Sequence, residues 1–553
     1  MDAFSRFTSV VPVRPEVRVL TLLLPVKCNG FKAIDKQLPA MHRDQSAGVS
    51  MQANLSFLRA RVLQSIRCKT AHASTCGLVF LLSLLLASCL LCGGTETAAP
   101  ALTITPALGP PTTSMAISGS GFDPYAAVDI YFDAAELAVA TTNGAGVFGA
   151  ASVHGGILLQ VPASAIPGYH WIAAVERSGQ KLVRKSFLVR TDWAQFLFSP
   201  DHKGLNPYEN VLSPGTVGNL GLRWRYQTGD VVQSSPAVAN GVLYFGSGDN
   251  NLYALDGTTG ALLWKYTTGS SVYSSPAVAN GVAYVGGWDG NLYAVNATTG
   301  QLLWQYSTDG EIYASPAVAN GVVYFGSYDG NLYAVNATTG ALLWKRTTEG
   351  YILLSAAVAD GVVYIGSYDP DGNLYALNAS TGELLWQRRL GFAVYSSPTV
   401  ANGVVYIASD DFNLYALNAS SGAYLWQYDT SSFIYSSPAV ANGVVYFGGT
   451  SDQTIYALNA GTGALLWNYR TGYAIYSSPA VANGVVYVGS ADQNLYALNA
   501  TTGAFLWKYT TGGAILSSPA VANGIVYVGS NDGNLYVFDL TGGRLSKSFS
   551  PLP

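Results

Sequence analysis

The residue types that most often carry catalysis, cysteine and histidine, are confined to the first 202 residues of this 553-residue chain. The five cysteines lie at positions 28, 68, 76, 89 and 92, and no Cys, His or Met follows Lys203. Thiol nucleophiles, imidazole bases, CxxC redox pairs and His-ligated metals all require these side chains. We therefore predict no catalytic residue in the region after Lys203.

Aspartates recur at a fixed place in that region, and carboxylates in such a series could hold cations. They stand in Asp-Gly-Asn-like turns at positions 249, 289, 329, 371, 411, 452, 492 and 532. Asp-Gly is also a preferred hairpin turn, and because that explanation suffices we predict no metal site. The Asn-Ala-Thr and Asn-Ala-Ser sequons at 296, 336, 378, 418 and 499 are likewise interpreted as turn chemistry rather than glycosylation.

These turns belong to a repeat that the stretch from Ser477 to Trp507 shows clearly. Side-chain alternation predicts strands over 477–482, 485–489 and 494–499, separated by the turn residues 483–484 and 491–493. A fourth strand begins near the tryptophan, and four antiparallel strands at a period of about 40 residues are typical of a propeller blade. The marker tryptophans are Trp224, Trp264, Trp304, Trp344, Trp386, Trp426, Trp467 and Trp507.

The number of copies predicts a propeller of eight blades. The three-strand portion occurs eight times, but no tryptophan strand follows the last copy, whereas the strand Leu222–Thr228 stands alone before the first. We expect this early strand to complete the eighth blade, so that main-chain hydrogen bonds close the ring without a long unpaired edge. The alternative takes Arg544–Phe549 as the last strand and leaves Trp224 outside the ring.

The segments before the tryptophans carry a family resemblance. They read ALDGTTGALLW at 254–264 and ALNATTGAFLW at 497–507. These segments resemble the tryptophan-docking motif of the quinoprotein-type, PQQ-repeat propellers, in seven consecutive copies. The resemblance implies an all-β, eight-bladed propeller in which Thr-Gly turns the chain and each indole packs across the gap between blades. The eight marker tryptophans are therefore interpreted as structural.

The N-terminal part of the chain indicates export. Residues 77–92 contain an apolar run of signal-peptide length, preceded by Arg and Lys residues. The run includes Leu86-Ala87-Ser88-Cys89, which resembles the lipobox of bacterial lipoproteins, so we expect Cys89 to carry lipid; the alternative is an ordinary signal or an anchor helix. Residues 1–76 stay unassigned, and a start codon further downstream would explain them.

Between the signal and the propeller the sequence predicts a second domain. A short linker at 93–100 is followed by alternating strands with Pro and Gly turns over 101–190. This pattern resembles bacterial immunoglobulin-like domains and has the length of a β-sandwich. A lead-in segment at 191–220 then precedes the propeller, which we place at 221–543 with a tail at 544–553.

Comparison of the repeats with one another locates a candidate binding surface. The VANGV turns and the turns before the tryptophans are nearly uniform, and by propeller geometry they share one face, the uniform face. The other two connections vary in sequence and in length, and we call their side the variable face. Exposed aromatics are typical interface anchors, and the candidates on the variable face are Trp288, Tyr328, Tyr351, Tyr368, Phe412, Phe433 and Tyr473.

A second set of aromatics directly precedes the inner strands: Tyr273, Tyr313, Tyr395, Tyr435 and Tyr476. Two interpretations are open for it. The rings either line the rim of the central channel or pack between blades, and packing is the favoured interpretation.

Composition and resemblance together favour a binding protein. The net charge is −4 and Lys and Arg are scattered, so nucleic acid is not expected as a partner. The architecture is similar to the BamB family of the outer-membrane barrel-assembly machinery. That similarity implies a non-catalytic, lipid-anchored and monomeric scaffold, at the outer membrane or the cell surface, which binds envelope proteins.

Two other functions are open. One is a surface adhesin or glycan-binding module, and the other is a dehydrogenase that depends on pyrroloquinoline quinone (PQQ) and Ca²⁺. The family resemblance implies that such dehydrogenases carry an adjacent Cys pair and long insertions between strands. This propeller has no Cys and only short loops, and we therefore expect no cofactor.

Overall fold

The computed structural model describes residues 99–149 and 156–541. The export signal, Cys89 and the alternative last strand at 544–549 lie outside these residues. Within the described ranges, no helix is long and apolar enough to cross a membrane. The elements described are strands, with one 3-10 helix, η1 (Val217–Asn219), which confirms the predicted all-β class.

The repeat folds as a four-stranded antiparallel sheet. The clearest copy consists of β35 (Ala480–Ala482), β36 (Val485–Gly489), β37 (Asn494–Asn499) and β38 (Phe505–Thr510), ordered from the inner to the outer strand. Asn483 and Gly484 connect β35 to β36 with φ values of 42° and 78°, a left-handed pair that an Asn-Gly turn adopts at little cost. The outer strand alternates between exposed and covered residues, because it lies at the edge of the sheet.

Six other sheets repeat this order along the chain. Three of them consist of β11 (Ala237–Ala239), β12 (Val242–Gly246), β13 (Asn251–Asp256) and β14 (Leu262–Thr267); β15 (Ala277–Ala279), β16 (Val282–Gly286), β17 (Asn291–Asn296) and β18 (Leu302–Ser307); and β19 (Ala317–Ala319), β20 (Val322–Gly326), β21 (Asn331–Asn336) and β22 (Leu342–Thr347). The other three consist of β23 (Ala357–Ala359), β24 (Val362–Gly366), β25 (Asn373–Asn378) and β26 (Leu384–Arg389); β27 (Thr399–Ala401), β28 (Val404–Ala408), β29 (Asn413–Asn418) and β30 (Tyr424–Asp429); and β31 (Ala439–Ala441), β32 (Val444–Gly448), β33 (Thr454–Asn459) and β34 (Leu465–Arg470).

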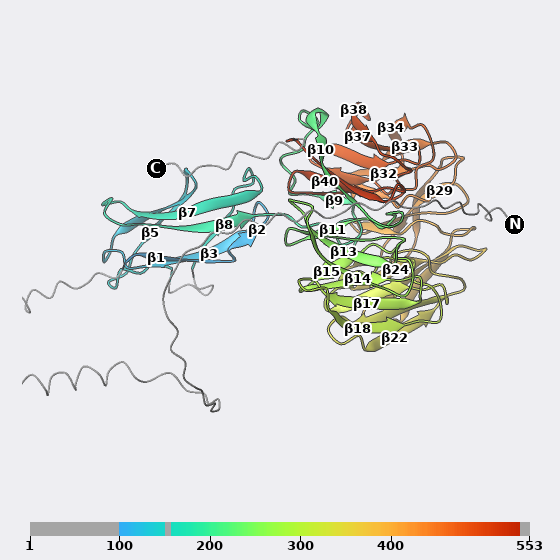
Figure 1. The fold of residues 1–553 in the computed structure, drawn as a ribbon, viewed down its shortest axis with the longest axis horizontal. Helices are drawn as coiled ribbons and strands as arrows, with labels where there is room; N and C mark the ends of the chain where they lie inside the picture. The colour runs from blue at the N-terminus through green and yellow to red at the C-terminus, as the bar shows by residue number, and fades with distance from the viewer. Residues whose placement is uncertain (1–98, 150–155, 542–553) are drawn as a thin grey trace, which may run out of the picture. The chain divides into compact units, whose positions relative to one another are not determined.

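The remaining sheet joins the two ends of the propeller. β39 (Ala520–Ala522), β40 (Ile525–Gly529) and β41 (Asn534–Asp539) pair in order, and β10 (Gly221–Gln227) pairs antiparallel with β41. Trp224 is thereby the register partner of Val537. Figure 1 shows the green β10 in the same region as the red β40. The prediction that the early tryptophan strand completes the last sheet is confirmed.

A second closure runs around the inner strands. Each sheet has a buried serine two residues before its inner strand, and its Oγ accepts a hydrogen bond from the backbone N–H of the equivalent serine in the preceding sheet. The circle is unbroken, because the N–H of Ser518 donates to Ser235 of the first sheet at 2.9 Å. We call these residues the serine ring: Ser235, Ser275, Ser315, Ser355, Ser397, Ser437, Ser478 and Ser518.

The lead-in segment passes all eight inner strands in chain order. Trp193, which is 2% exposed, pairs with Val238 of the first sheet, and β9 (Leu205–Asn206) adds to β35 as a parallel strand. Between and beyond these points, lead-in residues 194, 195, 200, 201, 203, 204 and 206 bond in turn to Val278, Val318, Val358, Val400, Val440, Val481 and Val521. The segment therefore follows the inner ends of the sheets near the uniform face, where Asn483 and Asn523 also bond to it.

Each marker tryptophan connects two sheets. The indole N–H of Trp264 donates to the carbonyl of Ala297 in the docking turn of the next sheet, at 3.0 Å. The ring lies against the glycine of that turn, and a Cβ added at Gly300, where φ is 73°, would come within 2.8 Å of the indole. Equivalent bonds are made by Trp304, Trp344, Trp386, Trp426 and Trp467. Trp224 donates to Thr258 in the docking turn of the first sheet, and Trp507 donates to Leu220, directly before β10.

Residues 101–189 form two further sheets. One contains β1 (Ala101–Thr105), β3 (Ser114–Ser120) and β6 (Ile157–Gln160), and the other contains β2 (Leu108–Gly109), β8 (Leu182–Val189), β7 (Gly168–Glu176), β4 (Ala127–Phe132) and β5 (Ala135–Thr141). Their buried core draws on both sheets, with Ile117 from one and Phe187 from the other. The assignment of this region as immunoglobulin-like stays a prediction.

Candidate functional site

The two kinds of connection lie at opposite ends of the strands, as the propeller geometry predicts. In the second sheet the N–H of Trp288 bonds to the carbonyl of Ser271, which joins the two variable connections, and equivalent bonds occur in the other sheets. At the other end the N–H of Ala297 bonds to the carbonyl of Gly281, which joins the two uniform turns. The length changes near Asp369 and Thr450 both fall on the variable face.

A cavity of about 480 Å³, which we call the cup, lies inside the serine ring. The eight ring serines line it, and Phe196 of the lead-in segment contributes one of its walls. Because the lead-in segment passes all eight inner strands near the uniform face, the cup is reached from the variable face. A cavity of this size falls within the range that holds small-molecule ligands in proteins.

Tyrosines line the cup above the serines, and we call this set the tyrosine crown: Tyr273, Tyr313, Tyr395, Tyr435 and Tyr476. The equivalent positions in the other three sheets hold Gln233, Leu353 and Leu516. The ring centroids of Tyr395 and Tyr435 are 4.7 Å apart. These rings line the cavity and also pack against the rings of neighbouring sheets, so each of the two interpretations is correct in part.

The pKa of several crown hydroxyls is raised. Burial is the main cause, and a nearby carboxylate, Asp410, adds to it at Tyr395 and Tyr435; the pKa of Tyr435 is raised to about 12. The hydroxyls of Tyr313, Tyr395 and Tyr435 are therefore neutral at physiological pH.

The seven aromatics predicted for the variable face fall into two groups. Trp288 and Tyr328 are 44% and 37% exposed and also line the cup. The others do not line it: Tyr368 is half-buried against Tyr395, and the exposed ones are Tyr351, Phe412, Phe433 and Tyr473. The ring centroid of Phe433 lies 4.9 Å from that of Phe412 and 5.9 Å from that of the crown residue Tyr435. The exposed aromatics are therefore continuous with the crown.

Asp410 is a site residue that the comparison of repeats missed. The N–H of Asp410 donates to the carbonyl of Ala393, and the N–H of Trp288 donates to the carbonyl of Ser271 in the same way. Asp410 therefore occupies the position that Trp288 has in the second sheet. Its Oδ1 is buried without a hydrogen-bond partner among the described residues. Burial, and secondarily the charge of Asp411, raises the pKa of Asp410 to about 6. The adjacent aspartates at 410–411 are the sequence signal that could have found it, since no other copy has two aspartates side by side in this turn.

The repeated turn aspartates are engaged by the protein itself. The Asp249 carboxylate accepts hydrogen bonds from the Tyr253 hydroxyl and from the N–H of Gly229, both at 2.7 Å. Burial alone would raise the pKa of Asp249, but these bonds, with others from the turn, outweigh it and hold the pKa below its usual value. Hydrogen bonds of the same kind outweigh burial and lower the pKa of Asp329, Asp492 and Asp532.

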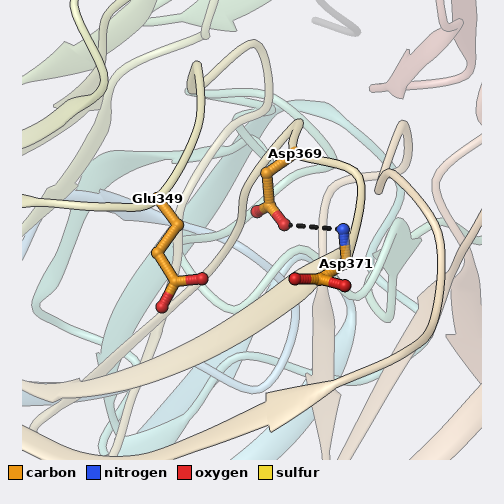
Figure 2. Close-up of side chains that lie close together, drawn as sticks. All are labelled: Glu349, Asp369 and Asp371. Carbon is orange, nitrogen blue, oxygen red and sulfur yellow. Dashed lines mark hydrogen bonds between the residues drawn. The ribbon is translucent and has the colours of Figure 1, made fainter.

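The fourth copy departs from this pattern. Carboxylate oxygens of Glu349, Asp369 and Asp371 lie within 4.8 Å of one another, and oxygen ligands of this kind suit hard cations. Figure 2 shows the three side chains converging from two connections of the variable face. Asp371, which the sequence placed as the turn residue, points instead into this group.

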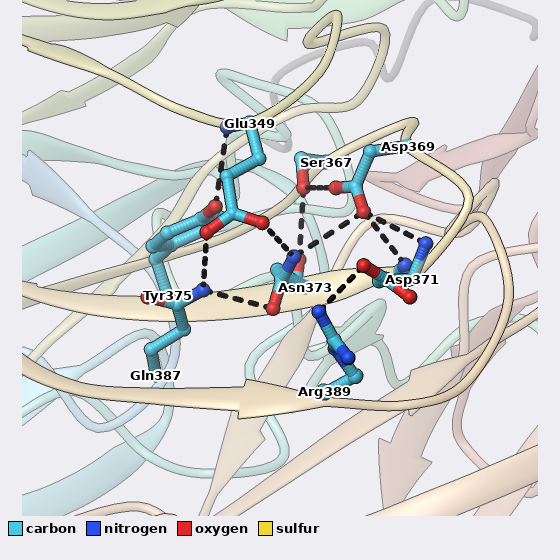
Figure 3. A network of polar contacts seen from close by, with 9 residues as sticks. Glu349, Ser367, Asp369, Asp371, Asn373, Tyr375, Gln387 and Arg389 are labelled. Carbon is cyan, nitrogen blue, oxygen red and sulfur yellow. Dashed lines mark hydrogen bonds and ion pairs between the residues drawn. The ribbon is translucent and has the colours of Figure 1, made fainter.

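Protein donors surround all three carboxylates, as Figure 3 shows. Asp369 accepts from the Ser367 hydroxyl and from two turn amides, Glu349 accepts from the side-chain amides of Asn373 and Gln387, and Asp371 pairs with Arg389 at 2.5 Å. Because each carboxylate is engaged by donors of the protein itself, we assign the group the structural role of holding the inserted loop.

Comparison with known proteins places the chain among propellers. The model of a family described as outer membrane protein assembly factor BamB matches residues 172–352 and 451–546, together half of the chain. A second model, described as the β-propeller of the beta-alanine-activating enzyme, matches residues 278–484. No protein with a curated description matches the sequence.

Similar solved structures include a BamB protein and alcohol-oxidising dehydrogenases. BamB from Moraxella catarrhalis is 21% identical with a TM-score of 0.52, over 58% of this chain and 99% of that one. A europium-containing methanol dehydrogenase is 14% identical with a TM-score of 0.57, over 63% and 98%. The quinohemoprotein alcohol dehydrogenase of Comamonas testosteroni is 17% identical with a TM-score of 0.57, over 66% and 82%. At these identities the likeness shows the fold alone.

The cup does not fit PQQ, the cofactor that quinoprotein propellers imply. PQQ carries three carboxylates, and a buried anion requires paired cations or a dense set of donors. Among the described residues, no Lys or Arg lines the cup.

Proposed function

Because the chain belongs to the family described as outer membrane protein assembly factor BamB, we propose that it is a non-catalytic scaffold of the cell envelope, which binds other proteins through the variable face of its propeller. The exposed aromatics of that face carry the proposal. Four rings outside the cup, Tyr351, Phe412, Phe433 and Tyr473, are between 36% and 59% exposed.

Aromatic side chains of this kind are enriched at protein interfaces, because they bury a large area at a low cost in conformational entropy. The uniform face, in contrast, presents Asn-Ala-Thr turns and the lead-in segment. The asymmetry between the two faces favours binding on one side of the ring.

The rest of the chain fits an extracytoplasmic position. We propose that Cys89 is lipidated after cleavage of the signal and that residues 101–190, an immunoglobulin-like module, space the propeller from the membrane. The region after Lys203 has no Cys and no His, and the cup does not fit PQQ, which supports binding rather than oxidation of alcohols.

A matched pair of phenylalanine variants tests the proposal. Phe412 is 37% exposed on the variable face, whereas Phe505 is 48% exposed on the outer strand β38. Affinity-tagged full-length protein is purified from the detergent-solubilised envelope of its own host, and co-purified proteins are quantified by mass spectrometry. We expect wild type and Phe505→Ala to retain subunits of the outer-membrane barrel-assembly machinery. The double variant Phe412→Ala, Tyr351→Ala should retain about one tenth of that amount of these subunits or less, because truncating an interface anchor costs more than about 1 kcal/mol of binding free energy.

Equal retention by all variants would contradict the assignment of the variable face. PQQ- and Ca²⁺-dependent reduction of a dye acceptor by the purified protein would contradict the non-catalytic role.

A further inference from the structure

We propose that the cup is a binding site for an uncharged saccharide, either a free sugar or the end of a glycan chain, held between the tyrosine crown and the serine ring. This inference concerns a different site from the proposed protein-binding surface, since that surface is assigned to rings outside the cup.

The crown supplies flat aromatic walls. Tyr273 and Tyr313 stand on one side of the cup with Trp288, and ring centroids of the three lie within 6.4 Å of one another. Tyr395, Tyr435 and Tyr476 form a second wall, with neighbouring centroids 4.7 and 6.0 Å apart. The electron-rich face of an aromatic ring attracts the weakly positive C–H groups of a pyranose, as it attracts the positive edge of another ring.

The serine ring supplies hydroxyl donors. Each Oγ already accepts one backbone N–H, at 2.9 Å for Ser437, and no described residue accepts a hydrogen bond from these eight hydroxyls. A hydroxyl has one proton to donate besides its two acceptor positions. Eight protons are therefore available to the cup at its deep end, and a ligand that reaches them must carry several acceptor oxygens.

The crown and Gln233 supply acceptors nearer the mouth. The five crown tyrosines and Gln233 line the cup, and hydroxyl and side-chain amide oxygens accept hydrogen bonds. Donors at the deep end and acceptors nearer the mouth match the hydroxyls of a sugar, which both donate and accept.

The same residues disfavour the other ligand classes. Anions meet no Lys or Arg in the lining. A purely apolar ligand would leave eight serine hydroxyls without water or acceptors. An organic cation would suit the aromatic rings but not a deep end made of hydroxyl protons.

The shape limits the saccharide to one that enters endwise. Phe196 of the lead-in segment lines the cup, and the segment passes all eight inner strands near the uniform face, which favours entry of a chain end from the variable face. Gln233, Leu353 and Leu516 interrupt the crown, and this asymmetry favours one orientation of the sugar among the eight that an ideal ring would offer.

Isothermal titration of the full-length protein tests the proposal. The probes are maltose, cellobiose and N,N′-diacetylchitobiose as neutral disaccharides, digalacturonic acid as an anion and choline as an organic cation. We expect saturable binding of at least one neutral disaccharide and none of digalacturonic acid or choline. Tyr435→Ala and Tyr395→Ala should each weaken that binding about tenfold or more, which is the loss typical of a stacked aromatic anchor.

Tyr473→Ala is the matched control, because Tyr473 is 59% exposed on the same face but does not line the cup; we expect it to change the affinity less than twofold. Tyr435→Phe keeps the ring and removes only the hydroxyl, so it should retain most of the binding even if an alanine variant fails to fold. Displacement of the disaccharide by envelope polysaccharide from the host identifies a glycan end as the natural ligand, and lack of displacement identifies a free sugar.

The proposal is overturned if no neutral disaccharide binds saturably, if choline or digalacturonic acid binds in their place, or if the crown variants bind like wild type. Loss of protein capture in Phe412→Ala has no bearing on these outcomes, so the two proposals fail separately.

Discussion

Replacing Asp410 by asparagine should stabilise the protein at neutral pH. Asn has the same shape as Asp but no charge to desolvate, and the Asp410 Oδ1 has no hydrogen-bond partner in the part of the chain that the structure describes. The pKa of Asp410 is raised from an ordinary value of 3.8 to about 6, because burial and the charge of Asp411 disfavour the ionised form. Ionisation of this carboxyl therefore weakens the native state.

The magnitude follows from linkage between protonation and folding. Below pH 3.8 the carboxyl is protonated in both states and contributes nothing. As the pH rises, the unfolded chain loses this proton first, so the native state loses stability until the carboxyl is ionised in both states, above about pH 6. The full difference in pKa corresponds to roughly 3 kcal/mol, and because Asp410 is only partly buried, screening by solvent reduces it to about 1 kcal/mol.

Differential scanning calorimetry from pH 4 to pH 8 at one scan rate measures this effect. A gain of about 1 kcal/mol raises the Tm of so large a unit by roughly 1 °C, since the entropy of unfolding grows with chain length. We expect Asp410→Asn to match wild type at pH 4 and to exceed it from pH 7 upward. Asp411→Asn is the control: its carboxylate accepts bonds from the Tyr415 hydroxyl and the Asn413 N–H, so its loss should lower the Tm at neutral pH. A gain for Asp410→Asn that is equal at every pH, or absent at pH 8, would refute the reasoning.

Three further predictions concern the ring and its anchor. Ser437→Ala leaves the buried N–H of Ser397 without its acceptor and should lower the free energy of unfolding by about 1–3 kcal/mol, as measured by denaturant unfolding; an unchanged midpoint would show that water replaces the hydroxyl. Deletion of Leu222–Thr228 should lower the Tm far more than deletion of 545–553, because the former opens the last sheet, and equal melting temperatures would contradict the closure. Metabolic labelling with palmitate should disappear in Cys89→Ser, and persistent label would refute lipidation there.

The repeated parts of the fold could be predicted from the sequence because each is set by local chemistry. Asn-Gly turns, alternating strands and the docking tryptophans recur in every copy, and the count of strands required β10 to pair with β41. The lead-in path could not be predicted, because most of its bonds to the valines of the inner strands use backbone atoms, which carry no sequence signal; only Gln195 and Asn206 use their side chains in these bonds.

The candidate site was predictable only in part. Comparison of the repeats found the exposed aromatics, since these residues lie in the two connections whose sequence varies from copy to copy. It placed the tyrosine crown only in part, because a tyrosine before an inner strand can contact the next sheet and face the central channel at once, and spacing alone does not show the second. The ring serines are the same in every copy, so the sequence indicated only that they belong to the repeated strand. The structure shows that they line a cavity.

The pairing of the first propeller strand with the last sheet imposes a delay during synthesis of the chain. Thr228 and Gly533, which bond to each other, are 305 residues apart. At typical rates of synthesis, β41 therefore follows β10 by on the order of half a minute. During that interval seven nearly identical sheets are synthesised, and each has an edge with which β10 could pair. Correct folding therefore requires every intermediate sheet to pair quickly with its own tryptophan strand. If one did not, β10 would pair with that sheet and the ring would close with fewer blades.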